Sequence, residues 1–420
     1  MDAYRIIGGK KLEGEIIISG AKNAALPVLA ACILAKGKTI LHNVPVLRDV
    51  NTMIKLLENM GITVKREKKT LIIDSSDIKS VEAPYSLVKT MRASFIVLGS
   101  LIARFHEARV SLPGGCAIGT RPVDIHIKAL RELGAHVEIE SGYVEAKAKK
   151  LTGNTIFLDF PSVGATENIM LAASLAIGQT IIKNPAKEPE IVCLADFINK
   201  MGGNVNGAGT DKIIINGVTK LYPVEFDIIP DRLEAGTFII AAAITKGKVI
   251  LKNTIPSHLE PLINKLEKAG IIIKKHDNGI IEASYGKQLK SLNIKTLPHP
   301  GFPTDMQPQM MALLSIANGT SIITENIFEN RFMHVAELCR MGAHIKVEDK
   351  NAIIEGINHL EGAEVMCSDL RAGAALVLAA LSATGKSLIQ RIYHIERGYE
   401  EFDKKLTLLG ANITHMETKL

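Results

Sequence analysis

The feature that most restricts how this chain can fold is an internal repeat that runs through its 420 residues. Each copy reads as a helix rich in small residues, a short strand, a second helix, and one or two further strands. The first helices begin near Gly20, Arg92, Gly164, Gly236, Phe302 and Asp369. The second helices end at Gly61, Gly134, Gly202, Gly270, Gly342 and Gly410. These glycines are 73, 68, 68, 72 and 68 residues apart, and glycine is favoured where a helix ends in a left-handed turn, so the pattern predicts six similar α/β units.

The two ends of the chain complement each other. Little chain follows Gly410, so the last copy lacks its final strand, whereas the first twenty residues hold two spare strand-like segments, RIIGG and EIIISG. We expect both segments to pair with the last copy and close its sheet. This predicts two domains, one of residues 22–230 with the first three repeats, and one of residues 1–21 plus 231–420 with the other three.

The composition indicates a globular protein of the cytoplasm. Hydrophobic residues make up 47% of the chain, but apolar runs such as AALPVLAACILA are shorter than the roughly 18 residues of a membrane span. The first residues do not form a basic region followed by an apolar one, so we expect no secretion signal and no membrane partner. Five cysteines without paired spacing predict reduced thiols.

The charge pattern favours small anionic ligands over nucleic acid. The net charge is +6, but the charges are spread along the chain and aromatic residues are only 4%. The histidines lack metal-ligand spacing, and neither a Walker loop nor a GxGxxG after a strand occurs. We therefore expect no metal, no nucleotide cofactor and no nucleic-acid partner.

A glycine-rich loop at residues 111–122 carries the most reactive candidate side chain, Cys116. Three glycines within six residues allow backbone conformations closed to other residues, so the loop can move as a lid. Arg121 and Pro122 then open a helix. A thiol beside a cation and a helix N-terminus tends toward the thiolate, which suits an acid or nucleophile, including that of a thiol hydrolase. The alternative is a buried cysteine that acts as a small hydrophobe.

Cations stand at helix starts, where acidic residues are normally favoured. One set lies in the first turn of a repeat's first helix: Lys22, Arg92, Arg232 and Arg371. A second set lies just before the second helix: Arg48, Arg121, Arg331 and Arg397. Simple solvent exposure explains any one of them. Corresponding positions in several repeats instead predict a site for a multiply charged anion such as a phosphate or carboxylate.

Asp305 has two interpretations. The segment Thr304–Gln307 reads as a capping box, in which an acid just inside the helix serves structure alone. The functional interpretation is a carboxylate in a cationic site, able to accept a proton from a substrate hydroxyl.

The chain resembles the family of UDP-N-acetylglucosamine enolpyruvyl transferases over essentially its whole length. The motifs that carry the resemblance are GAKNAALP at 20–27, MRAS at 91–94, PGGCAIGTRPVD at 113–124, SVGATE at 162–167, PDRLEAGTF at 230–238, HPGFPTDMQ at 299–307, ENRFMH at 329–334, SDLRAGA at 368–374 and RIYHIERGYE at 391–400. The resemblance implies an α/β fold of two domains, each an inside-out α/β barrel of three repeats, with the active site between them.

The resemblance also implies a reaction. The family transfers the enolpyruvyl group of phosphoenolpyruvate to the 3′-hydroxyl of UDP-N-acetylglucosamine and releases phosphate through a tetrahedral ketal, in the first committed step of peptidoglycan precursor synthesis. It uses no cofactor, and the antibiotic fosfomycin alkylates the lid cysteine. A monomer is expected.

Roles for individual residues follow from the same resemblance. Cys116 would protonate or trap phosphoenolpyruvate, Asp305 would take the sugar-hydroxyl proton, and Asp369 would assist proton movement. The residues expected to bind phosphoenolpyruvate or line its site are Lys22, Asn23, Arg92, Arg121, Arg371 and Arg397. Those expected to hold the sugar nucleotide are Arg121, Pro122, Val123, Asp124, Ile125, Ser162, Val163, Gly164, Asp305 and Ile327.

One departure and two alternatives remain. Some family members have a lysine just before the Ser-Val-Gly turn, where this chain has Phe160 and Pro161. The alternatives are a 3-phosphoshikimate enolpyruvyl transferase, although that relative does not use a lid cysteine, and a catalytically silent paralogue that serves as a binding module.

Overall fold

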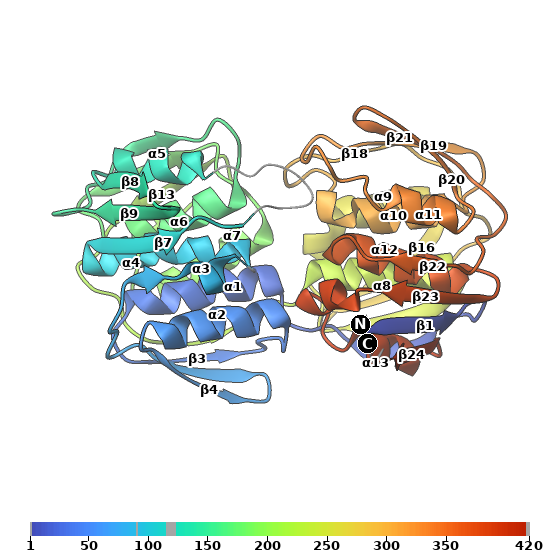
Figure 1. Ribbon diagram of the computed structural model, residues 1–420, viewed down its shortest axis with the longest axis horizontal. Helices are drawn as coiled ribbons and strands as arrows, with labels where there is room; N and C mark the ends of the chain where they lie inside the picture. Colours follow the sequence, from blue (N-terminus) through green and yellow to red (C-terminus); the bar gives the residue numbers. More distant parts are fainter. Residues whose placement is uncertain (1, 90, 115–122, 417–420) are drawn as a thin grey trace. The chain divides into compact units, whose positions relative to one another are not determined.

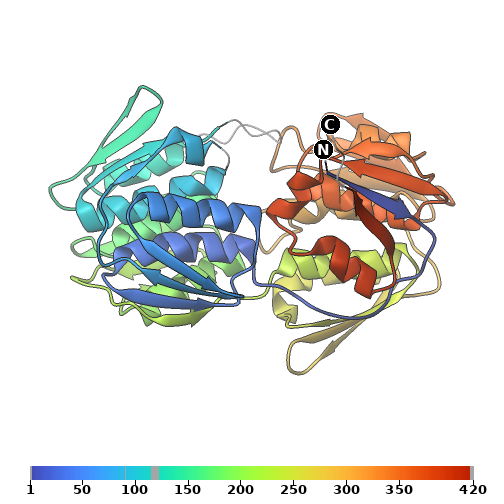
Figure 2. The same ribbon diagram turned by 60° about the horizontal axis from the view of Figure 1, so that its bottom comes forward.

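The computed structural model describes residues 2–89, 91–114 and 123–416. Contacts divide the chain into two compact units (Figures 1 and 2). The middle unit runs from Gly20 to Ile229, and the terminal unit joins the residues up to Ser19 to those from Pro230 onward. Both ends of the chain therefore belong to the terminal unit.

Three four-stranded sheets frame the middle unit, and all have the same strand arrangement. The first two strands of each sheet are parallel, and the remaining neighbours are antiparallel. In order across each sheet, the strands are β14 (Glu225–Asp227), β3 (Lys38–His42), β5 (Thr70–Asp74) and β4 (Thr63–Glu67); β6 (Glu82–Ala83), β7 (Glu107–Ser111), β9 (Tyr143–Lys147) and β8 (His136–Glu140); and β10 (Thr155–Phe157), β11 (Gln179–Lys183), β13 (Lys212–Asn216) and β12 (Val205–Asn206).

The terminal unit repeats this arrangement in three further sheets. In order, their strands are β2 (Glu13–Ile17), β15 (Lys248–Lys252), β17 (Ile280–Tyr285) and β16 (Ile271–His276); β18 (Ile294–Lys295), β19 (Thr320–Thr324), β21 (Asn351–Glu355) and β20 (His344–Glu348); and β22 (Glu364–Met366), β23 (Lys386–Gln390), β1 (Ala3–Ile7) and β24 (Asn412–Met416).

The two N-terminal strands join different sheets, which corrects the expectation that both pair with the last copy. β1 lies between β23 and β24 and completes the last sheet, as predicted. β2 instead runs parallel to β15, with Glu13 opposite Lys248. The sheet of β15, β17 and β16 also has a parallel edge strand, and β2 occupies this position before the chain continues into the middle unit.

Helices fill the centre of each unit. Those of the middle unit are α1 (Lys22–Ala31), α2 (Arg48–Asn59), α3 (Tyr85–Val88), α4 (Val97–Phe105), α5 (Asp124–Glu132), α6 (Val163–Ala173) and α7 (Pro189–Lys200). Those of the terminal unit are α8 (Arg232–Ile244), α9 (Glu260–Lys268), α10 (Gln307–Leu314), α11 (Val335–Arg340), α12 (Leu370–Ser382) and α13 (Phe402–Leu408).

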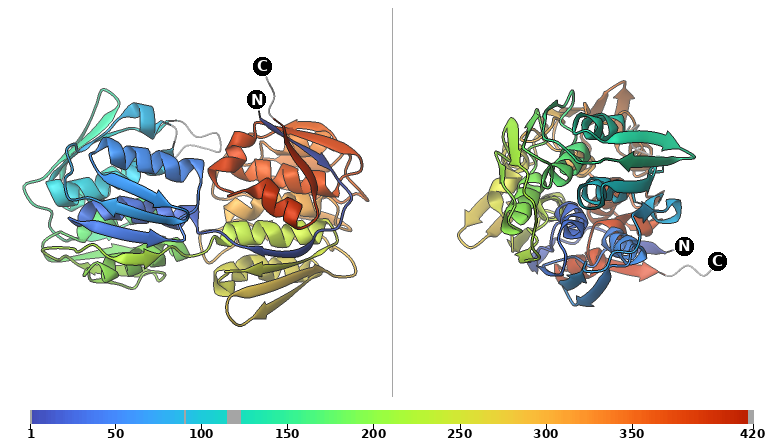
Figure 3. Two further views of the ribbon diagram at one scale, coloured as in Figure 1. Left: turned by 90° about the horizontal axis from the view of Figure 1, so that it is seen from below. Right: turned by 90° about the vertical axis from the view of Figure 1, so that its left-hand side faces the viewer.

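The burial of these elements follows from their sequences. α12 is apolar on every side and is buried from Arg371 to Leu381, and α8 is buried from Leu233 to Ile244. Strands such as β3 alternate buried and more exposed residues, so one sheet face covers the helices and the other faces outward (Figure 3). The repeat glycines end the second helices with φ values of 97°, 91°, 95°, 97°, 90° and 94°, a left-handed conformation that glycine adopts without steric cost. No helix in the described ranges combines the length and apolarity that a bilayer crossing requires.

Candidate functional site

Lys22 is the first residue of α1, and its ammonium group faces a carboxylate. The Nζ atom lies 3.2 Å from Asp49 Oδ2 on α2, and both side chains are largely buried. α1 starts without a side-chain cap and without an acidic residue in its first turn. Asp49 therefore offsets the charge of Lys22 beside the positive end of the helix. With Asn23 next to it, this helix start can bind a small anion.

Asp305 lies between two arginines in the terminal unit. Its Oδ1 accepts a hydrogen bond from Arg331 Nη2 at 3.0 Å, and its Oδ2 accepts from Arg371 Nη2 at 3.2 Å and Arg371 Nε at 3.3 Å. The arginine side chains are 2% and 4% exposed, whereas that of Asp305 is 31% exposed. The guanidinium groups favour the ionised carboxylate, which still reaches solvent and can accept a proton there.

The capping-box interpretation of Thr304–Gln307 is wrong. Thr304 Oγ1 donates to Glu325 Oε2 at 2.9 Å instead of accepting from a helix N–H, and α10 has no side-chain cap. The buried Glu325 also accepts from the N–H of Ile327 at 2.9 Å, so it organises this loop. The local role of Asp305 is therefore ion pairing and not capping.

Asp369 and Arg371 meet at the start of α12. Asp369 is the helix cap, because its Oδ1 accepts from the N–H of Arg371 at 2.9 Å and of Ala372 at 3.1 Å. The guanidinium of Arg371 lies over the ring of Tyr399, 5.3 Å from its centroid. Burial lowers the pKa of Arg371, but Tyr399 and Asp305 outweigh this and the pKa is raised. Arg371 is thus a permanent cation that holds Asp305.

Two of the remaining predicted residues, Arg92 and Arg397, lie in 3₁₀ turns and not at the start of an α-helix. Arg92 opens a 3₁₀ turn that ends at Ile96, so the α-helix starts only at Val97. Arg397 ends another 3₁₀ turn and is half-buried. Cys116, Arg121 and Pro122 lie outside the residues that the structure describes.

The starts of α5 and α6 are brought together within the middle unit. α5 begins at Asp124, which is exposed, and α6 follows its cap Ser162, whose Oγ accepts from the N–H of Ala165 at 3.4 Å. A Cβ atom added at Gly164 would lie 3.3 Å from Cε1 of His126 on α5. Two predicted nucleotide-binding segments, distant in sequence, are therefore neighbours.

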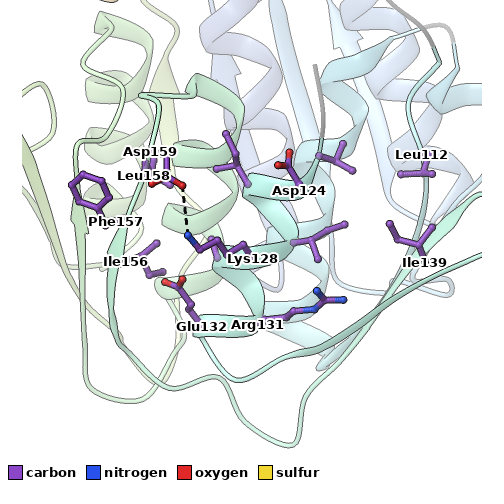
Figure 4. A pocket seen from close by; sticks show the side chains of 14 residues that line it. Leu112, Asp124, Lys128, Arg131, Glu132, Ile139, Ile156, Phe157, Leu158 and Asp159 are labelled. Atoms are coloured by element: carbon purple, nitrogen blue, oxygen red, sulfur yellow. Dashed lines mark ion pairs between the residues drawn. The ribbon is translucent and has the colours of Figure 1, made fainter. Parts of the chain in front are cut away.

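A cavity of about 540 Å³ runs along α5 (Figure 4). Asp124, Ile125 and Lys128 line it from the helix, and Phe157 and Asp159 line it from β10 and the loop after it. Its other lining residues are mostly apolar. Lys128 Nζ lies 3.6 Å from Asp159 Oδ2. An apolar hollow with a few charged groups suits the planar, polar-edged part of a small ligand.

Three residues that contact predicted site residues have no assigned role in the sequence analysis. The repeat places Arg331 without linking it to Asp305, and no motif singles out His126 or Tyr399. His126 is 8% exposed and Tyr399 2%. Tyr399 lies within the motif at 391–400, and His126 lies two residues after the motif at 113–124. For His126, the available signal was a polar residue on the inward face of a predicted helix.

The chain is similar to known transferases along its full length. Residues 6–406 match the family model described as EPSP synthase (3-phosphoshikimate 1-carboxyvinyltransferase). The UDP-N-acetylglucosamine 1-carboxyvinyltransferase of Desulfatibacillum aliphaticivorans is 53% identical over 99% of this chain and 100% of its own. The UDP-N-acetylglucosamine 1-carboxyvinyltransferase 1 of Caldanaerobacter subterraneus is 56% identical over 96% of this chain and 96% of its own.

Solved structures show the same fold. The enolpyruvyl transferase NikO from Streptomyces tendae has a TM-score of 0.90 at 24% identity, covering 100% of this chain and 99% of its own. EPSP synthase from Acinetobacter baumannii has a TM-score of 0.79 at 20% identity, covering 99% of this chain and 100% of its own.

Proposed function

The chain belongs to the UDP-N-acetylglucosamine 1-carboxyvinyltransferase family, and we propose on that basis that it transfers the enolpyruvyl group of phosphoenolpyruvate to the 3′-hydroxyl of UDP-N-acetylglucosamine. The observation that carries this proposal is identity of 53–56% to enzymes of that name over nearly the whole chain. The pairing of Asp305 with two buried arginines supports it.

The chemistry is an addition followed by an elimination. In the addition, the sugar oxygen bonds to C2 of phosphoenolpyruvate, its proton goes to Asp305, and C3 takes a proton from an acid, for which we propose Cys116. In the elimination, C3 of the tetrahedral ketal returns a proton to the acid deprotonated in the first step, with help from Asp369, the double bond re-forms, the C2–O bond to phosphate breaks, and the proton held by Asp305 leaves with the phosphate. Protons balance over the two steps, so the residues need no external oxidant or reductant.

Cations would stabilise the phosphate and carboxylate of the donor through the reaction. We assign this role to Lys22, Arg121 and Arg397, with the neutral amide of Asn23 beside them and Arg92 and Arg371 lining the same site. The pair between Lys22 and Asp49 supports the assignment, because a partly buried ammonium group held by one carboxylate keeps further donors for an anion.

The sugar nucleotide would bind through Val123, Asp124 and Ile125 at the start of α5 and through Ser162, Val163 and Gly164 at the start of α6, with Ile327, Arg121 and Pro122 as further contacts. The adjacency of the two helix starts and the cavity along α5 support this assignment. An apolar wall with a carboxylate at its end fits a nucleobase, which has flat faces and a hydrogen-bonding edge.

The wider setting belongs to the same proposal. We propose a cytoplasmic monomer that performs the first committed step of peptidoglycan precursor synthesis, is alkylated by fosfomycin at Cys116, and is built from six repeats as two inside-out α/β barrels. The six sheets of one strand arrangement support the repeat origin.

A phosphate-release assay tests the function. Purified protein is given phosphoenolpyruvate with UDP-N-acetylglucosamine, with shikimate 3-phosphate, or with neither acceptor, each with and without fosfomycin. We expect release only with the sugar nucleotide, and loss of it after fosfomycin treatment. Release with shikimate 3-phosphate alone would establish the related synthase activity, and no release with either acceptor would indicate a binding module.

A further inference from the structure

His126 is a buried, neutral histidine beside the start of α6, and the proposed mechanism does not use it. The side chain lies on α5 with its residue 8% exposed. Burial, with a smaller contribution from the positive charge of Arg92, lowers the pKa of His126 to about 3. A neutral imidazole has one donor nitrogen and one acceptor nitrogen, and the partner of either one decides which is which.

Asn168 on α6 determines which nitrogen of the His126 ring carries the proton. Oδ1 of Asn168 accepts from the backbone N–H of Gly99 at 2.7 Å. A backbone N–H can only donate, so this contact fixes which end of the amide is oxygen. Nδ2 therefore faces the carbonyl oxygen of Phe95 at 3.3 Å and Nδ1 of His126 at 2.8 Å. Because the amide nitrogen can only donate, Nδ1 of His126 must accept, and the ring proton must lie on Nε2.

The donor nitrogen is turned toward Gly164. A Cβ atom added at Gly164 would lie 3.6 Å from Nε2 and 3.3 Å from Cε1, so this edge of the ring faces the first turn of α6. The ring of Phe95 stands edge-on to the imidazole at 5.3 Å and fixes its plane. Among the residues that the structure describes, none accepts a hydrogen bond from Nε2. The N–H groups at a helix start also lack intrahelical acceptors, so donors converge here.

We propose that Asn168 is a positioning residue that holds His126 as the Nε2–H tautomer, so that the ring presents a hydrogen-bond donor to an oxygen of the sugar-nucleotide substrate at Gly164. The identity of this substrate rests on the proposed function, whereas the tautomer does not. In the other tautomer, a nitrogen lone pair would face the substrate oxygen and repel it. The donor therefore discriminates in favour of an oxygen-bearing ligand without adding a charge.

The first test is independent of any substrate. We would record ¹⁵N spectra of histidine-labelled, unmodified protein between pH 5 and 8 and assign His126 with the His126→Gln variant. A neutral ring with the proton on Nε2 over the whole range is expected. A proton on Nδ1, or a doubly protonated ring at pH 5, would overturn the proposal even if the protein turns over the sugar nucleotide.

The second test uses Asn168→Asp, which keeps the acceptor for Gly99 but places an oxygen against Nδ1. At pH 8 we expect a neutral ring with its proton on Nδ1, so that Nε2 can no longer donate; the same ¹⁵N spectra detect a charged ring, which would keep that donor. We expect KM for UDP-N-acetylglucosamine to rise about tenfold while kcat changes less than threefold, the effect of one lost hydrogen bond to a bound ligand. Asn206→Asp adds the same charge to an exposed strand residue of the same unit and should leave both constants unchanged.

A double variant separates positioning from general structural damage. A glutamine at position 126 carries its own N–H donor, and this donor does not depend on Asn168. In the His126→Gln background, Asn168→Asp should therefore have little further effect on KM. An equal rise in KM in both backgrounds would mean that Asn168 acts only through the structure of α6, and the proposal would fail although the transferase activity stands.

Discussion

Asp305 and His126 are held in opposite ways by the same kind of scaffold. Asp305 is charged, is 31% exposed and is gripped by two buried guanidinium groups. His126 is neutral, is 8% exposed and is fixed by an amide that is itself fixed by a backbone N–H. A group proposed to accept a proton from substrate has to be accessible and to be ionised before it does so. A group that only donates a hydrogen bond can be buried except for its donor edge, because burial disfavours its charged form and keeps it neutral.

The largest expected effect comes from neutralising the charged centre. Asp305→Asn should lower kcat by about 10²- to 10⁴-fold, the contribution typical of a positioned general base, with a smaller change in KM for phosphoenolpyruvate. Steady-state phosphate release measures both. Asp231→Asn is the control, since Asp231 caps α8 and also contributes a negative charge near Arg371. If the two variants lose equal activity, Asp305 serves only to neutralise the arginines.

A second charged centre tests whether buried ion pairs in this fold serve stability instead of chemistry. Lys405 on α13 pairs with Glu234 on α8 and donates to Ser19 Oγ at 2.7 Å, and none of these three residues is assigned a role in the proposed reaction. Lys405→Met should lower the free energy of unfolding by about 3–5 kcal/mol, because it leaves Glu234 buried without its cation. Urea unfolding measures this.

The neighbouring lysine provides the matched control. Lys404 is 70% exposed and pairs with Glu401 on the surface. Lys404→Met should change the free energy of unfolding by less than about 1 kcal/mol. Equal losses in the two variants would mean that the buried pair contributes nothing beyond the helix itself.

The buried neutral histidines should make the stability of the protein fall in acid. Burial lowers the pKa of His126 to about 3 and that of His334 to about 4, against about 6.5 in the unfolded chain. The unfolded state therefore binds more protons below pH 6.5, and stability is present above that pH and is lost as pH falls toward 4. The loss for each histidine approaches about 1.4 kcal/mol per pH unit.

Urea unfolding at pH 6.5, 5.5 and 4.5 checks this dependence. His126→Gln should remove one of the two contributions and make the loss of stability with acid less steep. His136→Gln changes a histidine whose side chain is 75% exposed and should leave the slope as it is. An unaltered slope in His126→Gln would show that the buried ring takes up protons as readily as the unfolded one.

The sequence allowed the closing glycines and the helix starts at Lys22, Arg48 and Arg232 to be predicted, because these depend on local periodicity and on backbone conformation, whereas Arg92 and Arg397 lie in 3₁₀ turns. It did not assign β2 to the sheet of β15, because the last copy visibly lacked a strand whereas nothing in the local sequence shows that the sheet of β15 also takes one from the N-terminus. The capping interpretation of Thr304 failed for the same kind of reason, because Glu325 lies 21 residues away and takes the hydroxyl. His126 became visible only when Asn168 and Gly164 were brought to it by packing.

The smallest expected effect concerns the support behind Asp305. The Oη atom of Tyr399 lies 2.9 Å from Thr237 Oγ1 and 3.1 Å from Gln309 Nε2, while its ring lies under Arg371. Tyr399→Phe should cost about 1 kcal/mol of stability and change kcat less than threefold, because Gln309 can still donate to Thr237 and the ring still packs under the guanidinium.

Thermal unfolding and phosphate release measure the two quantities, and Tyr143→Phe, which removes a hydroxyl from a half-buried strand residue of the other unit, is the control. A loss of kcat beyond tenfold in Tyr399→Phe would mean that the hydroxyl itself orients Arg371. The charged centre would then depend on a neutral hydrogen-bond network as much as His126 does, and the contrast between the two centres would lie in their exposure and not in how they are held.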